Sequence, residues 1–322
     1  MTDAIRPITL EEIQAARGRI AGTILRTPLV RLELGNGAPE IRLKLENLQP
    51  INAYKLRGAA NAVALLSDDE RRRGVWTISA GNAGQGVAYA AVKARVPCTV
   101  VAIESAPVAK IERMKALGAR VLPVSYARAW EALEDRAFPG VAGTFVHPFD
   151  DHNFIAGNAT MGLEILEDAP ETQTVIGAIG GGGLVVGVAS AVKALKPEIR
   201  VFGAEPETAA PAAVSFARGA PQTFPDWKAS FVDGAGGQSM FPRMWQRMQG
   251  LVDGSIIVSL DETRRAMRLL AEKPRVIAEG AGALSLAAAL GGRAGQGPIV
   301  AIVSGGNIDL AKFCELIADK NS

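Results

Sequence analysis

The stretch TVIGAIGGGGLVVGVASAVKAL, residues 174–195, joins an apolar strand pattern, four consecutive glycines and a helix pattern. Because Gly180 to Gly183 have no Cβ atoms, their N–H groups can point toward one spot, and the following helix adds the partial positive charge of its N-terminus. This turn is suited to holding a phosphate. A tight strand-to-helix turn without a ligand is the alternative, but such a turn needs only one or two glycines.

The rest of the chain repeats this alternation. Strand patterns lie at 75–79, 98–103 and 120–125 before the glycine turn, and at 200–205, 255–260 and 298–307 after it, with helix patterns between them. Near-continuous apolar strands joined by helices predict an α/β fold with parallel sheets flanked by helices. Two segments break the pattern. We interpret residues 145–162 as an irregular crossing between two lobes and 215–240 as a loop-rich excursion that helps to form a site.

Two further turns carry polar side chains after a strand. SAGN at 79–82 offers a hydroxyl, an amide and backbone N–H groups to an anion, and SGGN at 304–307 places Ser304 at the end of the last strand. Ser79 or Asn82 alone also suits a helix N-cap. Lys55 follows Tyr54 at the start of a helix pattern, and by itself it reads as a surface lysine. Together, these features fit a cofactor with a phosphate, a ring and an aldehyde, which predicts pyridoxal phosphate.

A dinucleotide is the alternative ligand for the glycine turn. Glu205 ends the next strand, at roughly the 20-residue offset from the glycines at which an acid would hold a ribose. However, Gly181, Gly183 and Gly187 give G-x-G-x-x-x-G, which misses the dinucleotide spacing. A nicotinamide-dependent oxidoreductase or other nucleotide-binding protein therefore remains the more distant alternative.

Composition narrows the partners. With 35 basic and 33 acidic residues among 322, the net charge of +2 gives no strong field for nucleic acid or a membrane surface, and Arg71 to Arg73 are expected to be a solvated helix end. Cys98 and Cys314 lie far apart in apolar stretches, so we expect two buried thiols without a disulfide. The N-terminus has no apolar targeting segment. We expect a cytoplasmic protein whose partner is a small molecule.

Four motifs, NAYKLRGA, SAGNAGQGVA, GGGGL and SGGN, in this order, resemble those of the fold-type II pyridoxal-phosphate enzymes, and within them the serine/threonine dehydratases. The likeness extends from TPLVRL at 27–32 to SGGN. It implies a two-lobed, tryptophan synthase β-like fold with the cofactor between the lobes. The large domain would comprise residues 1–73 and 148–322 and the small domain residues 74–147. A homodimer is also implied.

The resemblance assigns the cofactor contacts. Lys55 would form the Schiff base, Tyr54 would pack near the ring, and Asn82 would bond the ring hydroxyl. The phosphate would be held by Gly180, Gly181, Gly182, Gly183 and Leu184, and the pyridine nitrogen would meet Ser304. The substrate would lie against Ser79, Ala80, Gly81 and Ala83.

The implied activity is the removal of water from a β-hydroxy-L-amino acid of the threonine or serine type, which yields a 2-oxo acid and ammonia. A β-replacing synthase and a racemase of the same fold are alternatives. Racemases of this group have a serine at the position of Ala80, whose absence disfavours reprotonation of the opposite face. Ala83 stands where the dehydratases usually have histidine, and Tyr54 where they usually have phenylalanine. A reshaped pocket for a bulkier substrate such as phenylserine follows as a hypothesis.

Some relatives bind a divalent cation through a glutamate and an aspartate. Glu205 matches the glutamate, but Pro211 stands in place of the aspartate, so we predict no metal. His147 and His152 lack the neighbouring ligands of a metal site and are expected to be structural or exposed. Glu279 opens a helix pattern near the implied site, where a contact with the helix dipole and a functional role are equally compatible with the sequence.

Overall fold

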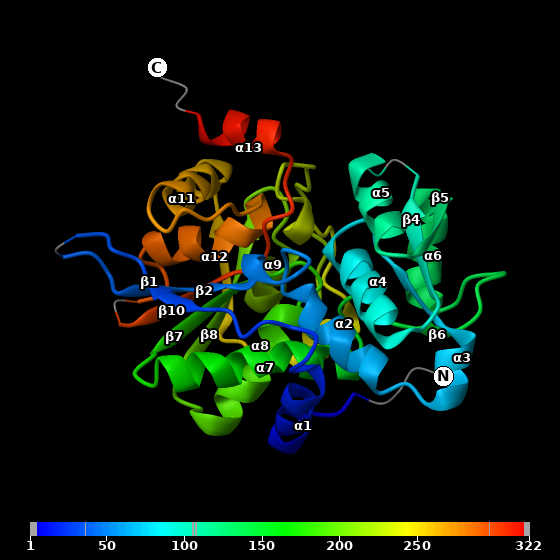
Figure 1. The fold of residues 1–322 in the computed structure, drawn as a ribbon. Coiled ribbons are helices and arrows are strands. Elements are labelled where there is room, and N and C mark those ends of the chain that lie inside the picture. The colour runs from blue at the N-terminus through cyan, green and yellow to red at the C-terminus, as the bar shows by residue number, and fades with distance from the viewer. Residues whose placement is uncertain (1–4, 36, 105, 107, 296, 319–322) are drawn as a thin grey trace.

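The computed structural model describes residues 5–35, 37–104, 106, 108–295 and 297–318. They form two separate β-sheets flanked by helices, as Figure 1 shows. The larger sheet has six strands in the order β1-β2-β10-β7-β8-β9. Its strands are β1 (Leu29–Arg31), β2 (Ile41–Leu45), β7 (Thr174–Ala178), β8 (Arg200–Pro206), β9 (Gly254–Val258) and β10 (Ile299–Val303). All neighbours pair in parallel except β1 with β2, which confirms the predicted α/β fold.

The smaller sheet has four parallel strands in the order β5-β4-β3-β6. They are β3 (Val75–Ile78), β4 (Cys98–Ile103), β5 (Arg120–Val124) and β6 (Thr144–Phe145). Every strand predicted from the apolar patterns is present, with bounds shifted by a few residues. We call the parts built around the two sheets the large and the small lobe, and the domain boundaries given above stay a prediction.

Helices cover the sheets on both faces. Those of the large lobe are α1 (Leu10–Ile20), α2 (Lys55–Ala64), α3 (Asp68–Arg73), α7 (His152–Asp168), α8 (Gly183–Leu195), α9 (Pro211–Arg218), α10 (Pro242–Met248), α11 (Leu260–Glu272), α12 (Gly280–Leu290) and α13 (Leu310–Ile317), with short 3₁₀ turns η1 (Glu46–Leu48) and η2 (Asp233–Ala235). Those of the small lobe are α4 (Asn82–Ala94), α5 (Val108–Ala116) and α6 (Tyr126–Asp135). In Figure 1, α7 and α8 lie below the six-stranded sheet, and α11 and α12 lie above it.

Two expectations about the chain are wrong. Residues 145–162 are not irregular throughout, because α7 begins at His152 and runs for 17 residues. Its start is fixed by Asp151, whose side chain accepts a hydrogen bond from the Phe154 N–H, and the small Gly157 lets it pack closely on α2. Cys98 is buried as expected, whereas Cys314 is exposed on α13.

The crossing between the lobes is held by one buried carboxylate. Asp150 accepts hydrogen bonds from Arg136 Nη2 at 2.5 Å, which comes from the small lobe, and from Arg243 Nε at 2.6 Å and Arg247 Nε at 3.0 Å, both on α10 of the large lobe. These three arginines keep the pKa of Asp150 below its usual range despite burial. The aspartate thus stays charged and links the two lobes.

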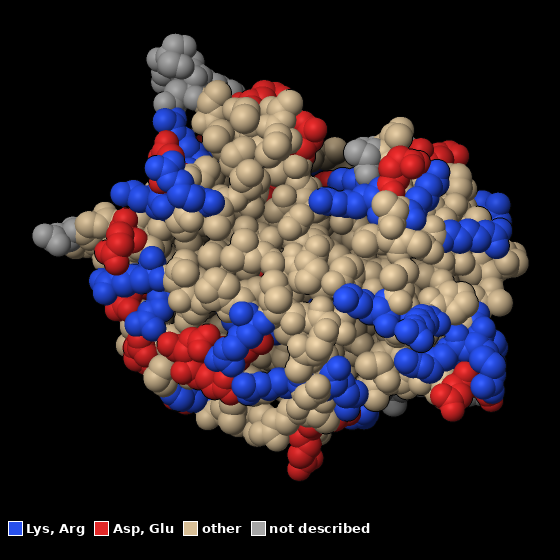
Figure 2. All heavy atoms as spheres, viewed as in Figure 1, with Lys and Arg blue, Asp and Glu red and all other residues tan. Residues whose placement is uncertain are grey.

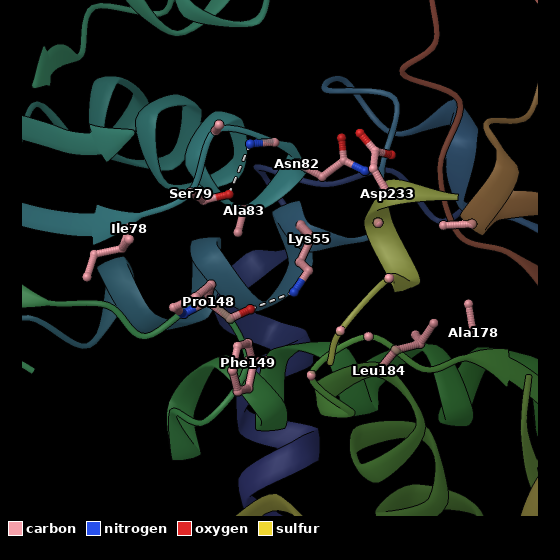
Figure 3. A pocket seen from close by; sticks show the side chains of 18 of the residues that line it. Lys55, Ile78, Ser79, Asn82, Ala83, Pro148, Phe149, Ala178, Leu184 and Asp233 are labelled. Atoms are coloured by element: carbon pink, nitrogen blue, oxygen red, sulfur yellow. Dashed lines mark hydrogen bonds between the residues drawn. The ribbon is translucent and has the colours of Figure 1, made fainter. Parts of the chain in front are cut away.

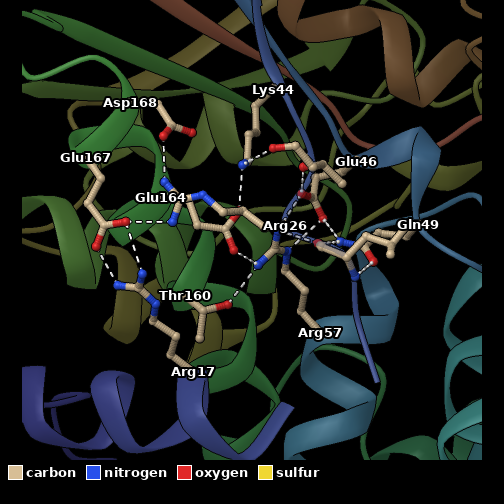
Figure 4. Close-up of polar contacts among 12 residues, drawn as sticks. Arg17, Arg26, Lys44, Glu46, Gln49, Arg57, Thr160, Glu164, Glu167 and Asp168 are labelled. Atoms are coloured by element: carbon tan, nitrogen blue, oxygen red, sulfur yellow. Dashed lines mark hydrogen bonds and ion pairs between the residues drawn. The ribbon is translucent and has the colours of Figure 1, made fainter. Parts of the chain in front are cut away.

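A second buried charge cluster fixes α2 in place (Figure 4). The Arg57 guanidinium on α2 donates to both carboxylate oxygens of Glu46, at 2.8 Å each, and of Glu164, at 2.7 and 2.8 Å. Lys44 on β2 donates to Glu164 at 2.5 Å and to the Thr27 carbonyl at 2.7 Å. The four charged side chains are 0–3% exposed. Two cations and two carboxylates therefore balance in the interior and bind α2 to η1 and α7.

The surface carries both signs of charge. Figure 2 shows acidic and basic side chains interspersed around the rim of the visible face, with uncharged residues across its centre. Arg71 to Arg73 end the exposed helix α3, as expected. Within the described part of the chain, no helix is long and apolar enough to cross a membrane.

Replacement of Arg57 by methionine is expected to lower the free energy of unfolding by about 3–5 kcal/mol, because two buried carboxylates lose their principal counter-charge. Denaturant titration followed by circular dichroism measures this loss. The matched control is Arg72→Ala, which breaks the exposed pair with Asp69 on α3 and should change stability by at most about 1 kcal/mol. Equal effects of the two substitutions would contradict a structural role for the cluster.

Candidate active site

A pocket of about 460 Å³ lies between the two sheets, at the carboxyl ends of their strands. Ser79 follows β3, Gly180 follows β7 and Ser304 follows β10, so parallel strands of the two sheets deliver these turns to one place. In open α/β sheets, this edge is where ligands bind. The predicted site residues that line the pocket are Tyr54, Lys55, Ser79, Ala80, Gly81, Asn82, Ala83, Gly180, Gly181, Leu184 and Ser304. Gly182 and Gly183 lie in the same turn without lining the pocket wall.

Lys55 is the first residue of α2 and points into the pocket (Figure 3). Its Nζ donates to the Pro148 carbonyl oxygen at 2.5 Å and lies 5.3 and 5.5 Å from the ring centres of Tyr54 and Phe154. Burial lowers the pKa of this amine from 10.5 to about 7. The two rings favour the charged form, but desolvation outweighs them. A substantial fraction of Lys55 is therefore a neutral amine, oriented by one N–H and with a lone pair for attack on an aldehyde.

The four-glycine turn leads into α8 with the geometry of an anion cradle. Gly182 has φ +88° and caps the helix, which begins at Gly183. A Cβ atom would lie 2.6 Å from the Gly234 oxygen at Gly180 and 2.8 Å from the Phe149 oxygen at Gly183, so side chains at these positions would collide with backbone. The first N–H groups of a helix have no partner within it. The turn can therefore donate several N–H groups to a phosphate.

The SAGN turn is held by its own hydroxyl. Ser79 Oγ accepts from the Gly81 N–H at 3.1 Å, and Gly81, rather than Ser79 or Asn82, is the N-cap of α4. Asn82 uses no side-chain oxygen on the helix and is free to face the pocket, where its Nδ2 donates to Glu279 Oε1 at 2.7 Å. Its amide can serve a ring hydroxyl, and the N–H groups at the start of α4 can serve a carboxylate.

Ser304 and Glu279 complete the polar wall. Ser304 is 5% exposed, and its hydroxyl makes only a long contact of 3.4 Å with the Ala281 carbonyl, so it can still meet a ring nitrogen. Glu279 is the N-cap residue of α12 without a side-chain cap bond. Burial and the nearby Asp233 raise its pKa to about 7. Its side chain faces Asn82 rather than its own helix, so the functional reading of Glu279 gains support over a helix-dipole contact.

Several pocket residues have no signal in the sequence. The excursion at 215–240 does help to form the site, as expected, through Asp233 and Gly236 to Ser239. Lys110 on α5 donates to Asp233 at 2.6 Å across the mouth of the pocket, but its segment reads as an ordinary surface helix. An apolar wall was also missed. It is formed by Ile78, Ile103, Trp130, Leu133, Phe149 and Phe241.

The residues considered for a metal or a ribose have other partners. The Glu205 carboxylate is 1% exposed and accepts from the N–H groups of Ala212 and Ala213, at 2.9 and 2.8 Å, and from the Ser255 hydroxyl at 2.7 Å. It caps α9 and is not available to a ribose hydroxyl. In the described ranges, no group of three metal-ligating side chains is present. The absence of a metal stays a prediction.

The two histidines have structural contacts. His147 is buried, and its Nδ1 accepts from the N–H groups of Phe149 and Asp150 at 3.3 and 3.0 Å. Burial lowers its pKa to about 3, so it stays neutral. His152 pairs with Glu12 at 2.9 Å, outside the pocket. Both residues therefore fit the structural role expected of them.

Lys55 in the cofactor-free protein should react with acetic anhydride in step with its neutral fraction. Since the pKa is lowered, the amine is charged below and neutral above pH 7, and labelling should rise with a midpoint near pH 7. Peptide mass spectrometry across a pH series measures this midpoint. A free lysine peptide, with a pKa of about 10.4, is the reference. A midpoint equal to that of the reference would contradict the effect of burial.

Comparison with known proteins identifies the family. The family described as "Pyridoxal-phosphate dependent enzyme" matches residues 20–305. An L-threonine ammonia-lyase of Thermotoga maritima is 40% identical over 96% of this chain and 78% of its own length. Among solved structures, maize serine racemase has a TM-score of 0.88 at 33% identity, covering 96% of this chain and 97% of its own. A threonine deaminase of T.th. has a TM-score of 0.85 at 36% identity, covering 94% and 99%. This chain belongs to the family of pyridoxal-phosphate dependent enzymes.

Proposed function

We propose that this protein is a pyridoxal-phosphate dependent ammonia-lyase that removes water from a β-hydroxy-L-amino acid and releases a 2-oxo acid and ammonia. The observation that carries the proposal is the joint position of a buried, largely neutral Lys55 and the Ser304 hydroxyl in one pocket beside a phosphate cradle. The 40% identity to a protein named L-threonine ammonia-lyase supports the reaction class.

The pocket fits the cofactor. Bound pyridoxal phosphate supplies an aldehyde that condenses with amines and a ring that withdraws electrons from the amino-acid Cα. We assign its phosphate to the N–H groups of Gly180 to Leu184, its ring hydroxyl to Asn82, its ring nitrogen to Ser304 and its aldehyde to Lys55. Tyr54 flanks the amine, with its ring centre 5.3 Å from Nζ.

Lys55 is the proposed base. An incoming amino acid displaces the Lys55 amine, which then accepts the Cα proton, and its pKa of about 7 keeps it largely unprotonated at neutral pH. The substrate carboxylate is assigned to the SAGN turn from Ser79 to Ala83, which holds the Cα–H bond toward the lysine. A hydroxyl such as Ser304, unlike a carboxylate, does not keep the ring nitrogen protonated. The weaker electron withdrawal favours prompt loss of the β-hydroxyl group over transamination.

Racemisation needs a second acid–base group on the face opposite Lys55. We assign Ala80 to that face, and its methyl group cannot transfer a proton. The fold-level similarity to maize serine racemase keeps a racemase as the second candidate, but Ala80 favours elimination. A β-replacing synthase would need a second nucleophile as co-substrate.

The apolar wall indicates the substrate class. Trp130 from α6 packs on Phe241 with ring centres 5.4 Å apart, and Phe241 packs edge-to-face on Phe149 at 5.0 Å. All three rings line the pocket. A methyl group such as that of threonine would leave much of this wall in contact with water, whereas an aromatic substituent would cover it. We therefore propose a β-hydroxy amino acid with a bulky apolar group, such as L-threo-phenylserine, as the preferred substrate.

Release of 2-oxo acid should be at least about tenfold more efficient, in kcat/KM, from L-threo-phenylserine than from L-threonine or L-serine, because the larger side chain buries more apolar surface. Coupled assays of keto-acid formation measure the ratio. Trp130→Ala should reduce the preference, while Tyr126→Ala, an exposed aromatic on the same helix outside the pocket, should leave it unchanged. A clear preference for threonine would contradict the substrate proposal but not the reaction class.

The same reactions separate the alternative activities. Elimination requires 2-oxo acid and ammonia in equal amounts without a second substrate. Formation of D-serine from L-serine, followed by chiral chromatography, would instead identify a racemase. Turnover that depends on an added thiol or amine would identify a synthase.

Lys55→Ala should abolish the visible absorption of the imine and reduce elimination to the background rate, because no other amine is proposed to reach the aldehyde. Borohydride reduction of the wild-type holoenzyme, followed by peptide mass spectrometry, should place the pyridoxyl group on Lys55. Pyridoxyl label on Lys110, which also lines the pocket, would overturn this assignment.

A further inference from the structure

The side chain of Asn307 lies where three segments of the pocket meet. It ends the SGGN turn after β10, and its Nδ2 donates to the Ile51 carbonyl at 2.8 Å and to Asn82 Oδ1 at 2.7 Å. Its Oδ1 accepts from Arg113 Nη1 at 2.6 Å. Ile51 belongs to the segment that leads into Lys55, Asn82 opens α4, and Arg113 lies on α5 of the small lobe. One amide thus joins the strand end of Ser304 to the supports of Lys55 and Asn82.

The contacts of Asn307 leave its amide only one orientation. Its nitrogen faces two acceptors, the Ile51 carbonyl and Asn82 Oδ1, and its oxygen faces a guanidinium, which can only donate. A flipped amide would place N–H groups against Arg113 and oxygen against the Ile51 carbonyl. Three unfavourable contacts would replace three favourable ones.

This orientation passes to Asn82. Because Asn307 presents an N–H, Asn82 must present its oxygen, and its own NH2 group turns to Glu279 Oε1 at 2.7 Å. An amide nitrogen carries two N–H groups, so the second can donate to a ligand in the pocket. A ring hydroxyl oxygen needs such a donor. Without Asn307, the Asn82 amide has no fixed partner for its oxygen, and the alternative rotamer becomes accessible.

The outer end of this chain crosses between the lobes. Arg113 and Lys110 lie one turn apart on α5, and both reach the large lobe, Arg113 at Asn307 and Lys110 at Asp233, each at 2.6 Å. The Arg113 contact therefore exists only while α5 lies against the large lobe. Its guanidinium polarises the Asn307 amide and strengthens the N–H that Asn307 donates.

We infer that Asn307 is a positioning residue that orients the Asn82 amide toward the ring hydroxyl of pyridoxal phosphate, and that Arg113 of the small lobe reinforces this orientation. The inference rests on the proposed function in one respect, the assignment of Asn82 to the ring hydroxyl. Neither Asn307 nor Arg113 contacts reacting atoms in this arrangement. Their effect reaches the cofactor through Asn82.

The test uses cofactor affinity rather than turnover. Pyridoxal phosphate is removed from the holoenzyme, and rebinding is titrated by absorption with pyridoxal phosphate and with an analogue whose ring hydroxyl is replaced by hydrogen. Asn307→Ala should weaken binding of pyridoxal phosphate by roughly tenfold, the effect of about one hydrogen bond. Binding of the analogue should change by less than about twofold, the scatter expected for uncoupled sites.

Arg113→Ala should cause a smaller loss, roughly two- to fivefold, with the same dependence on the ring hydroxyl, because exposed charged contacts contribute less. The matched control is Lys115→Ala on the same helix, whose ammonium pairs with Glu112 away from the pocket, and it should change neither affinity. In the double variant Asn82→Ala/Asn307→Ala, the losses should not add, since both substitutions remove the same contact.

Two outcomes would overturn the inference. Equal losses for pyridoxal phosphate and the analogue would show that Asn307 only supports the fold, and thermal unfolding of the cofactor-free variants would show the same loss of stability. Unchanged affinity in Asn307→Ala and Arg113→Ala would show that Asn82 orients without them. Failure of the wild-type protein to discriminate between the two ligands would instead refute the assignment of Asn82 within the proposed function.

Discussion

The paired burial of Arg57, Lys44, Glu46 and Glu164 is the constraint on which the position of α2 depends. A buried charge is tolerated only with its counter-charge and full hydrogen bonding, and each of these groups finds both. Such a cluster permits little displacement, because a small shift would leave a carboxylate unpaired in the interior. The first turn of α2 is therefore held against η1 and α7, and with it the lysine two residues before Arg57.

Two cations on this one helix turn meet opposite fates. The Arg57 guanidinium lies between two carboxylates, which hold its pKa above the usual range despite burial, so it is permanently charged. Lys55 is equally enclosed but has a carbonyl and two aromatic rings as neighbours, and burial lowers its pKa to about 7. The difference lies in the partners and not in the residue type or the depth. A structural cation and a reactive amine can thus share one turn of helix.

Much of this architecture could be predicted from the chain. The apolar strands and the glycine turn have local signatures, because a βα turn that binds phosphate needs residues without Cβ atoms. The helix α7 was missed in part, since Gly157 and Asn158 lower its intrinsic helix propensity, while packing against α2 and α8 stabilises it. The pairing of Arg57 with Glu164, the Lys110–Asp233 contact and the aromatic wall join residues distant in sequence. No local pattern marks such contacts, and they become visible only when both lobes are in place.

The charge around the pocket follows from how the lobes meet. An ionised Glu279 close to the site would favour the protonated form of nearby amines, yet burial and the neighbouring Asp233 raise its pKa to about 7, so it is only partly charged at neutral pH. Asp233 in turn is paired with Lys110 from the small lobe. The cation offsets part of the effect of Asp233 and lowers the pKa of Glu279. Contact of α5 with the large lobe therefore changes the charge of the carboxylate that Asn82 faces, and so the closed arrangement of the lobes sets both the geometry and the electrostatics of the cofactor site.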